Sequence, residues 1–170
     1  HALATALFGV LRPGDELLAL TGTPYDTLCT VIGHPEPVPG CLKEFGVTYR
    51  ETPFSLALSP ELIGAALRRE TRLVLIQRSC GYSLRQTLSI AHIEAICLAI
   101  KAVRPDCVVM VDNCYGEFTE TSEPTAVGAD LAVGSLIKNP GGGIAPTGAY
   151  IAGRADLIEL AASRLTAPGI

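Results

Sequence analysis

The chain has 170 residues, of which 48% are hydrophobic, 18% charged and 5% aromatic, and its formal net charge is −4. This length allows one domain with a sizeable core, and the composition fits a buried sheet covered by Ala- and Leu-rich helices rather than a disordered or fibrous chain. The 13 Lys and Arg residues are scattered, and no apolar run approaches the roughly 18 residues of a membrane helix, so we expect neither a nucleic-acid nor a membrane partner.

Helical and extended patterns alternate along the chain. Apolar runs bounded by Pro, Gly and polar residues predict strands at 16–20, 47–51, 72–77, 107–112, 131–135 and 148–152. Helical patterns cover 1–11, 25–32, 60–70, 89–104 and 155–165. Parallel strands need crossover connections, so this alternation predicts an α/β three-layer sandwich with a mostly parallel sheet covered on both faces.

Two of the predicted helices begin with capping signals. Ser59 precedes Pro60, which suits the first helical position, and Ser89 can cap the next helix. The apolar positions expected to face the core from this second helix are Ile90, Ile93, Ile96, Leu98 and Ile100.

The six cysteines favour a reducing compartment. No CxxC pair occurs, and no cysteine has metal-type spacing with His1, His34 or His92. We therefore expect free thiols, a cytoplasmic protein and no metal site. Cys80 and Cys114 lie in the candidate active-site loops after 72–77 and 107–112. No evident base accompanies either, so they are interpreted as unremarkable loop thiols rather than reactive ones.

Polar residues follow three of the predicted strands. They are Arg78 and Ser79 after 72–77, Asp112 and Asn113 at the end of 107–112, and Ser135 with Lys138 at the end of 131–135. Ligands of parallel α/β sheets bind outside the carboxyl ends of the strands, so we expect these residues to converge on one edge of the sheet.

Asp112 and Lys138 suggest the chemistry of that edge. Asp112 ends an apolar strand, where its carboxylate is costly to bury without a cationic or hydrogen-bond donor partner, and a protonated ring nitrogen is one such partner. Lys138 precedes Asn-Pro-Gly-Gly-Gly, a loop that suits a Schiff-base lysine, and we expect desolvation to lower its pKa. The glycines at 141–143 do not form the GxGxxG of a Rossmann dehydrogenase.

These motifs carry a family resemblance. VDNCYGEF and ADLAVGSLIKNPGGG resemble the Asp and Lys motifs of fold-type I enzymes that use pyridoxal 5'-phosphate (PLP). Together with HALATALFGVLRPGDELL, TGTPYDTL, IQRSCGYSLR and SLIKNPGGGIAPTGAYIAGR, they closely resemble the methionine gamma-lyase family proteins that are also called aluminium resistance proteins. The resemblance spans nearly the whole chain.

The resemblance implies a role for each candidate residue. Lys138 would form the Schiff base with PLP, Asp112 would pair with the pyridinium nitrogen, and Ser135 would contact the phosphate. Tyr25 would stack on the ring. The remaining candidates are Arg78 and Ser79 near the phenolic oxygen or the substrate carboxylate, Asn113 beside Asp112 or the ring oxygen, and His1 at a helix whose N-terminal amides would bind the phosphate. Many sulfur-metabolism PLP enzymes have Thr before the lysine, but this chain has Ile137 and so lacks one phosphate hydroxyl.

The resemblance also implies an activity and a domain organisation. Residues 1–170 would be the PLP-binding large domain of a longer protein, without its N-terminal segment, which contains a Gly-Thr turn, and without its small C-terminal domain. The expected function is a carbon–sulfur lyase that acts on a small sulfur-containing amino acid by β- or γ-elimination, in a homodimer or homotetramer. The alternatives are another fold-type I activity, such as transamination or replacement, and a truncated, inactive interaction module.

Overall fold

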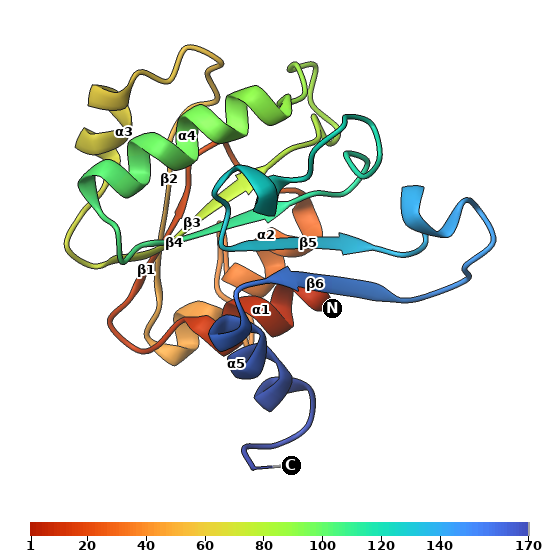
Figure 1. The fold of residues 1–170 in the computed structure, drawn as a ribbon. Coiled ribbons are helices and arrows are strands. Elements are labelled where there is room, and N and C mark those ends of the chain that lie inside the picture. Colours follow the sequence, from red (N-terminus) through yellow and green to blue (C-terminus); the bar gives the residue numbers. More distant parts are fainter. Residues whose placement is uncertain (170) are drawn as a thin grey trace.

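A computed structural model describes residues 1–169 and arranges them around one six-stranded sheet (Figure 1). The sheet order is β2-β1-β3-β4-β5-β6. In chain order the strands are β1 (Glu16–Ala19), β2 (Thr48–Glu51), β3 (Thr71–Gln77), β4 (Val108–Asp112), β5 (Leu131–Ser135) and β6 (Ala149–Gly153). All neighbouring strands pair in parallel except β5 and β6, which are antiparallel. The mostly parallel α/β sheet predicted from the sequence is confirmed.

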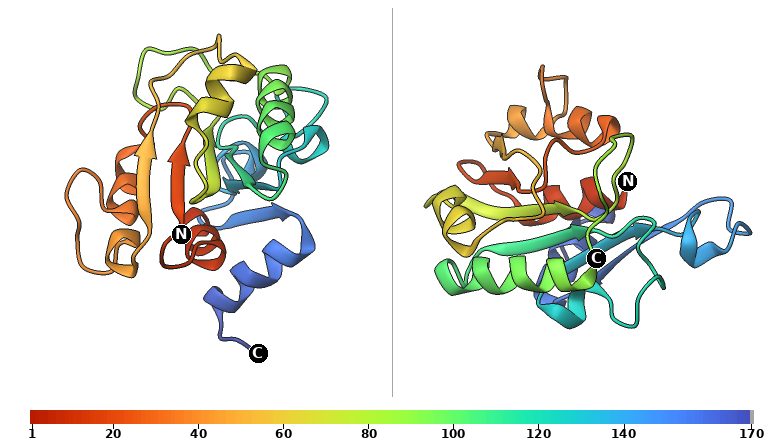
Figure 2. Two further views of the ribbon diagram at one scale, coloured as in Figure 1. Left: turned by 90° about the vertical axis from the view of Figure 1, so that its left-hand side faces the viewer. Right: turned by 90° about the horizontal axis from the view of Figure 1, so that it is seen from above.

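Helices cover both faces of this sheet. They are α1 (Ala2–Val10), α2 (Asp26–Ile32), α3 (Pro60–Ala66), α4 (Ile90–Val103) and α5 (Ala155–Leu165), with short 3₁₀ turns η1 (Leu42–Phe45), η2 (Pro124–Val127) and η3 (Asn139–Gly141). Seen from above, α4 lies on one face of the sheet, and α1 and α2 lie on the other (Figure 2). The sheet and the helices on its two faces therefore form the three layers predicted from the sequence.

The central strands are buried on both faces, which explains why they read as continuous apolar runs. Along β3, Leu73 and Leu75 join the core under α1 and α2, whereas Val74 and Ile76 join the core under α4. Full burial of one such side chain contributes about 1.5–3 kcal/mol, so the alternation fixes the register of the strand.

Helix α4 begins where its capping signal predicts, but one residue on its expected apolar face is wrong. The Ser89 hydroxyl accepts a hydrogen bond from the His92 N–H, and His92 Nδ1 accepts one from the Ser89 N–H at 3.2 Å. Leu98, expected in the core, is 65% exposed, and Cys97 is buried instead. At 3.6 residues per turn, position 98 falls on the opposite side of the helix from the stripe that contains Ile93 and Ile100.

Helix α3 is shorter than the sequence pattern predicts. The pattern extends to about residue 70, but the helix ends at Ala66, and Leu67 has an extended backbone. The Arg68 N–H donates to the Thr71 hydroxyl at 2.9 Å, and this turn leads the chain directly into β3. A local side-chain bond therefore competes with helix propagation.

The antiparallel direction of β6 determines where the last helix packs. Gly153 at the end of β6 pairs with Leu131 at the start of β5, so α5 begins at the edge of the sheet opposite the carboxyl ends of the parallel strands. There α5 packs beside α1, and a Cβ added to Gly9 would lie 2.9 Å from Ala161 Cα. Within residues 1–169, no helix has the length and apolar character needed to span a membrane.

Candidate functional site

A polar pocket of about 230 Å³ opens at the carboxyl ends of β3 and β4, beside the loop that follows β5. This volume lies below the usual range of ligand pockets, which begins at about 300 Å³. Its lining residues come from four loops and strand ends: Tyr25, Gln77, Ser79, Gly81, Tyr82, Asp112, Cys114, Tyr115 and Lys138. Four of the eight residues singled out from the sequence, namely Tyr25, Ser79, Asp112 and Lys138, therefore lie together.

Asp112 is a buried acid that faces this pocket without close pairing to a cation. It is 3% exposed, and its Oδ1 accepts a hydrogen bond from the Cys114 main-chain N–H at 3.1 Å. Burial raises the pKa of the Asp112 carboxyl above its ordinary value, and the hydrogen bonds from Cys114 and the charge of Lys138 only partly oppose this rise. A protonated nitrogen in the pocket would supply the cationic donor that this carboxylate lacks.

Lys138 enters the pocket from the loop after β5. Its Nζ lies 4.2 Å from the ring centroid of Tyr115, within the range of a cation–π contact. Burial by itself lowers the pKa of the Lys138 amine, but neighbouring acidic groups, above all Cys114, outweigh burial and raise the pKa. Desolvation therefore acts in the expected direction, but the expected net fall in the Lys138 pKa is wrong, because acidic neighbours stabilise the ammonium.

Cys114 lies between the two titratable groups. Burial and the nearby Asp112 raise the pKa of its thiol to about 11, so the thiol is protonated at neutral pH. This agrees with an inert thiol, although Asp112 and Lys138 do lie beside it, which the sequence had not suggested. All six cysteines are free.

Tyr25 is held at the pocket by its neighbours on the sheet. It is the N-cap residue of α2, and its main-chain N–H donates to Gln77 Oε1 at 3.0 Å. Burial first, and then the charge of Asp112, raise the pKa of the Tyr25 phenol to about 12. The side chain therefore presents a neutral aromatic ring to the pocket.

Arg78 does not line this pocket, because its side chain is buried and bonded to other residues of the protein. It is 3% exposed, and its guanidinium donates to Asn113 Oδ1 at 2.8 Å and to Glu120 Oε1 at 2.7 Å. It also donates to the main-chain oxygens of Gly116 at 2.8 Å and Leu88 at 3.3 Å. These bonds tie the loops after β3 and β4 together.

Asn113 belongs to the same internal network. Besides accepting from Arg78, it donates through Nδ2 to Glu123 Oε2 at 2.8 Å and to the Tyr150 hydroxyl at 3.2 Å. The Tyr150 hydroxyl in turn donates to Glu117 Oε1 at 2.9 Å. This places the Asn113 side chain away from the pocket, although it is adjacent to Asp112 in the chain.

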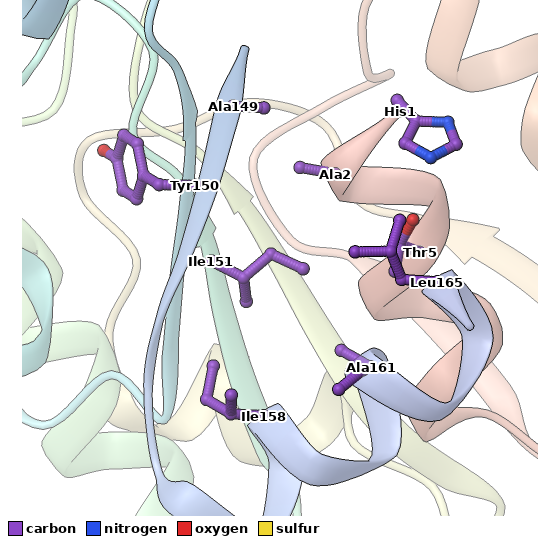
Figure 3. A pocket seen from close by; sticks show the side chains of 10 residues that line it. His1, Ala2, Thr5, Ala149, Tyr150, Ile151, Ile158, Ala161 and Leu165 are labelled. Carbon is purple, nitrogen blue, oxygen red and sulfur yellow. The ribbon is translucent and has the colours of Figure 1, made fainter. Parts of the chain in front are cut away.

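Ser135 and His1 also lie outside the pocket lining. Ser135 Oγ accepts a hydrogen bond from the Ile137 N–H at 3.3 Å and so shapes the turn that leads to Lys138. His1 lies at the start of α1 and lines a separate pocket with Ile151, Ile158 and Leu165 (Figure 3). That pocket, of about 330 Å³, is larger and mainly apolar, and no acidic or lysine side chain lines it.

Several pocket residues were missed by the sequence reasoning. They are Gln77, Gly81, Tyr82 and Tyr115, whereas Cys114 was placed in a site loop but was interpreted as an unremarkable thiol. One signal was present for Gln77: it is the single polar residue at the end of an apolar strand, next to the strand that Asp112 ends. In residues 1–169 no group of three or more His, Cys, Asp or Glu side chains could hold a metal ion.

Three residues of the pocket fit the ring and the aldehyde group of PLP. Asp112 offers a buried carboxylate for a protonated ring nitrogen, Tyr25 offers an aromatic face, and Lys138 offers a primary amine. These three residues could hold the cofactor in one pocket, and the chemistry of the donor set matches a planar cationic ring with an electrophilic carbon.

A family model described as methionine gamma-lyase matches residues 1–170. The chain is 47% identical over 173 residues to the uncharacterized protein YnbB of Bacillus subtilis, and the match covers 100% of this chain and 41% of that protein. Two solved structures are similarly close. One, named a carbon-sulfur lyase involved in aluminum resistance from Clostridium novyi, has 51% identity and a TM-score of 0.93, and the match covers 100% of this chain and 41% of that one.

The other, from Listeria monocytogenes, is named provisionally as a cystathionine beta-lyase involved in aluminum resistance. It has 47% identity and a TM-score of 0.95, and the match covers 100% of this chain and 42% of that one. The chain thus spans about two fifths of these relatives' length. More distant structures, such as the PLP-dependent protein YhfS of Escherichia coli at 16% identity and a TM-score of 0.69, share the fold.

Proposed function

This chain belongs to the methionine gamma-lyase family, and from that premise we propose that the full protein is a PLP-dependent carbon–sulfur lyase acting on a small sulfur-containing amino acid. The names of the Clostridium novyi and Listeria monocytogenes relatives support this reaction class. Elimination at the β or γ carbon is the proposed chemistry.

The observation that carries the proposal is the meeting of Asp112 and Lys138 in one pocket. An amine that can bind a carbonyl and a buried acid that lacks a cationic partner are the two groups that a pyridine aldehyde needs. Separately, each residue has an ordinary structural interpretation, as a strand-end cap or a surface lysine. Together they support a cofactor site.

Three of the pocket residues have a proposed task in this reaction. Bound PLP supplies an electron sink for the carbon that loses its proton. Lys138 would hold the cofactor through Nζ and, once released by the substrate amine, would remove the α proton. Asp112 would keep the proton on the ring nitrogen, and Tyr25 would pack against the ring. Phosphate binding by Ser135 and by the α1 amides near His1 stays a prediction.

The roles of three further residues near the site are also proposals. Ser79 lines the pocket and would approach the phenolic oxygen or the substrate carboxylate. Arg78 and Asn113 would act indirectly, since their bonds hold the loops that present Ser79 and Asp112.

A homo-oligomer is proposed as the working form. Large apolar side chains are exposed on the three loops that surround the pocket: Tyr82, Leu84, Tyr115, Phe118, Ile137 and Ile144. Clustered exposed apolar groups are typical of interaction sites. A second copy of the protein is the proposed partner, and sedimentation of the full-length protein checks its mass.

Borohydride reduction of the full-length protein with added PLP tests the site. We expect visible absorbance that is lost on reduction, with the pyridoxyl label on Lys138 when peptides are mapped. Lys43 and Lys101 are internal controls, because Lys101 is bound to Asp130 at 2.6 Å and neither lysine lines the pocket. A label on another lysine, or no label, contradicts the assignment.

Product analysis then tests the reaction. Pyruvate from cystathionine or cysteine indicates β-elimination, and 2-oxobutyrate from methionine or cystathionine indicates γ-elimination. An amino-group transfer product instead would assign the protein to transamination. Binding of PLP without any product from these substrates would contradict the lyase proposal.

A further inference from the structure

Gln77, which the sequence did not single out, makes hydrogen bonds to several residues around the pocket. It is the last residue of β3, its Cα partner on β4 is Asp112, and it is only 6% exposed. Its side chain lines the pocket. A buried carboxamide needs both a donor and an acceptor among its neighbours, because an unpaired polar group is costly.

Gln77 fastens both ends of the turn that carries Tyr25. Its Oε1 accepts from the Tyr25 main-chain N–H at 3.0 Å, and its own main-chain N–H donates to the Thr21 hydroxyl at 2.9 Å. Tyr25 is a helix N-cap residue, and Gly22 within the turn has φ +88°. The turn thus has little regular structure of its own. These two bonds hold it in position together with the bond that the Thr23 hydroxyl donates to Glu51 Oε1 at 2.8 Å.

The other half of the carboxamide bonds to the loop that follows β3. Nε2 donates to the main-chain oxygen of Ser79 at 3.3 Å. One side chain therefore spans from the loop before α2 to the loop after β3. Glutamate would keep the acceptor but lose this donor, and methionine would lose both.

We propose that Gln77 is a positioning residue that sets the Tyr25 ring at the distance from the β4 edge that a bound planar cofactor needs. The expected effect on PLP binding rests on the proposed function. The hydrogen bond between Gln77 and the Tyr25 N–H is present without the cofactor and can be tested without it. Gln77 would act through Tyr25 and would not touch the reacting atoms.

The first test uses the full-length protein without PLP. Hydrogen–deuterium exchange, resolved to the Tyr25 amide by fragmentation, reports directly on the bond to Gln77 Oε1. We expect roughly five- to ten-fold faster exchange in Gln77→Met, corresponding to one lost hydrogen bond. Gln77→Glu keeps the acceptor and should keep the amide slow. Gln86→Met, at an exposed glutamine of the loop that follows β3, is the matched control.

The second test is a double-mutant cycle on PLP affinity. We expect Gln77→Met to weaken PLP binding about ten-fold in the wild-type background and to have little further effect when Tyr25 is already alanine. Equal losses in both backgrounds would mean that Gln77 does not act through Tyr25. If Gln77→Met fails to fold, Gln77→Ala, which also removes the acceptor for the Tyr25 N–H, takes its place in the cycle.

The two proposals fail in different ways. If the wild-type protein binds no PLP, the proposed function falls, and the exchange experiment still decides the role of Gln77. If the wild type binds PLP but the Tyr25 amide exchanges equally fast in the wild type and in Gln77→Met, the positioning role falls alone.

Discussion

The ammonium nitrogen of Lys138 lies 4.2 Å from the ring centroid of Tyr115, and the backbone of Tyr115 has φ +68°. A bulky residue in the left-handed region is strained, and such outliers concentrate at functional sites. The loop after β4 therefore accepts strain at the position where an aromatic ring meets the candidate lysine.

Replacing Tyr115 by leucine should lower the pKa of the Lys138 amine in cofactor-free protein by about half a unit, because a cation–π contact at an exposed site stabilises the charged form by about 0.5–1 kcal/mol. Tyr115→Phe retains the ring and should retain the pKa. The pH dependence of Lys138 acylation, followed by mass spectrometry with Lys43 as reference, measures it. Equal values for the Leu and Phe variants would exclude a role for the ring.

Asp112→Asn should stabilise the cofactor-free protein at pH 7. Burial raises the folded-state pKa of Asp112, so the folded state binds more protons than the unfolded state, and stability falls as pH rises from about 4 through the raised pKa. Asparagine removes this cost and still offers Oδ1 to the Cys114 N–H. Thermal melts should separate the variant from the wild type at pH 7 and bring them together below pH 4.

Asp106→Asn supplies the control with the opposite sign. A hydrogen bond from Arg104 lowers the pKa of Asp106 to about 2, so its contribution to stability is present above the ordinary carboxyl pKa and is lost as pH falls through about 2. The side chain is 62% exposed, and its loss should lower the melting temperature slightly at pH 7. A lower melting temperature for Asp112→Asn at pH 7 would contradict the burial argument.

Arg78→Met should reduce the free energy of unfolding by about 3 kcal/mol, because it leaves the buried Asn113 and the partner Glu120 without their cation. Urea denaturation measures this loss. Arg72→Met, which removes one exposed bond to a main-chain oxygen, should change stability by no more than about 0.5 kcal/mol. If Arg78→Met instead weakens PLP binding at unchanged stability, a direct cofactor contact would be indicated.

Gly141→Ala should displace the Lys138 loop. The added Cβ would collide with the Leu136 main-chain oxygen and lie 2.7 Å from the Ala145 Cβ. Overpacking of this kind costs about 1–3 kcal/mol, so PLP affinity should fall about ten-fold if the loop must shift. Gly142→Ala meets no atom within 4 Å and carries only the strain of φ +56°, so its effect on PLP affinity should be smaller.

The elements were predictable because their signals are local. Buried strands such as β4 read as apolar runs, and the Ser89 cap marks the start of α4 within one residue. Leu98 was misplaced because an apolar residue was assigned to the core by its type rather than by its angular position on the helix. The end of α3 depends on the Thr71 hydroxyl, which becomes a competitor only when the chain turns into β3.

The site was predictable only in part, and for a reason that comes from the topology of the sheet. Parallel topology brings strand ends together, and this placed Asp112 and Lys138 at one pocket. It does not specify side-chain direction beyond the last strand residue. Arg78 turns inward to the loop after β4, whereas Gln77 faces the pocket, and only the three-dimensional course of the loops decides between them.

The close approach of α1 and α5 at Gly9 and Ala161 affects how the chain acquires its structure. During synthesis α1 emerges before all six strands and α5 after them, so the surface of α1 that α5 covers stays open to water until the sheet has been made. Contacts between segments so distant in sequence raise the contact order and slow folding. A substitution that enlarges Gly9 should therefore interfere with the docking of α5 on α1, after the strands have already paired.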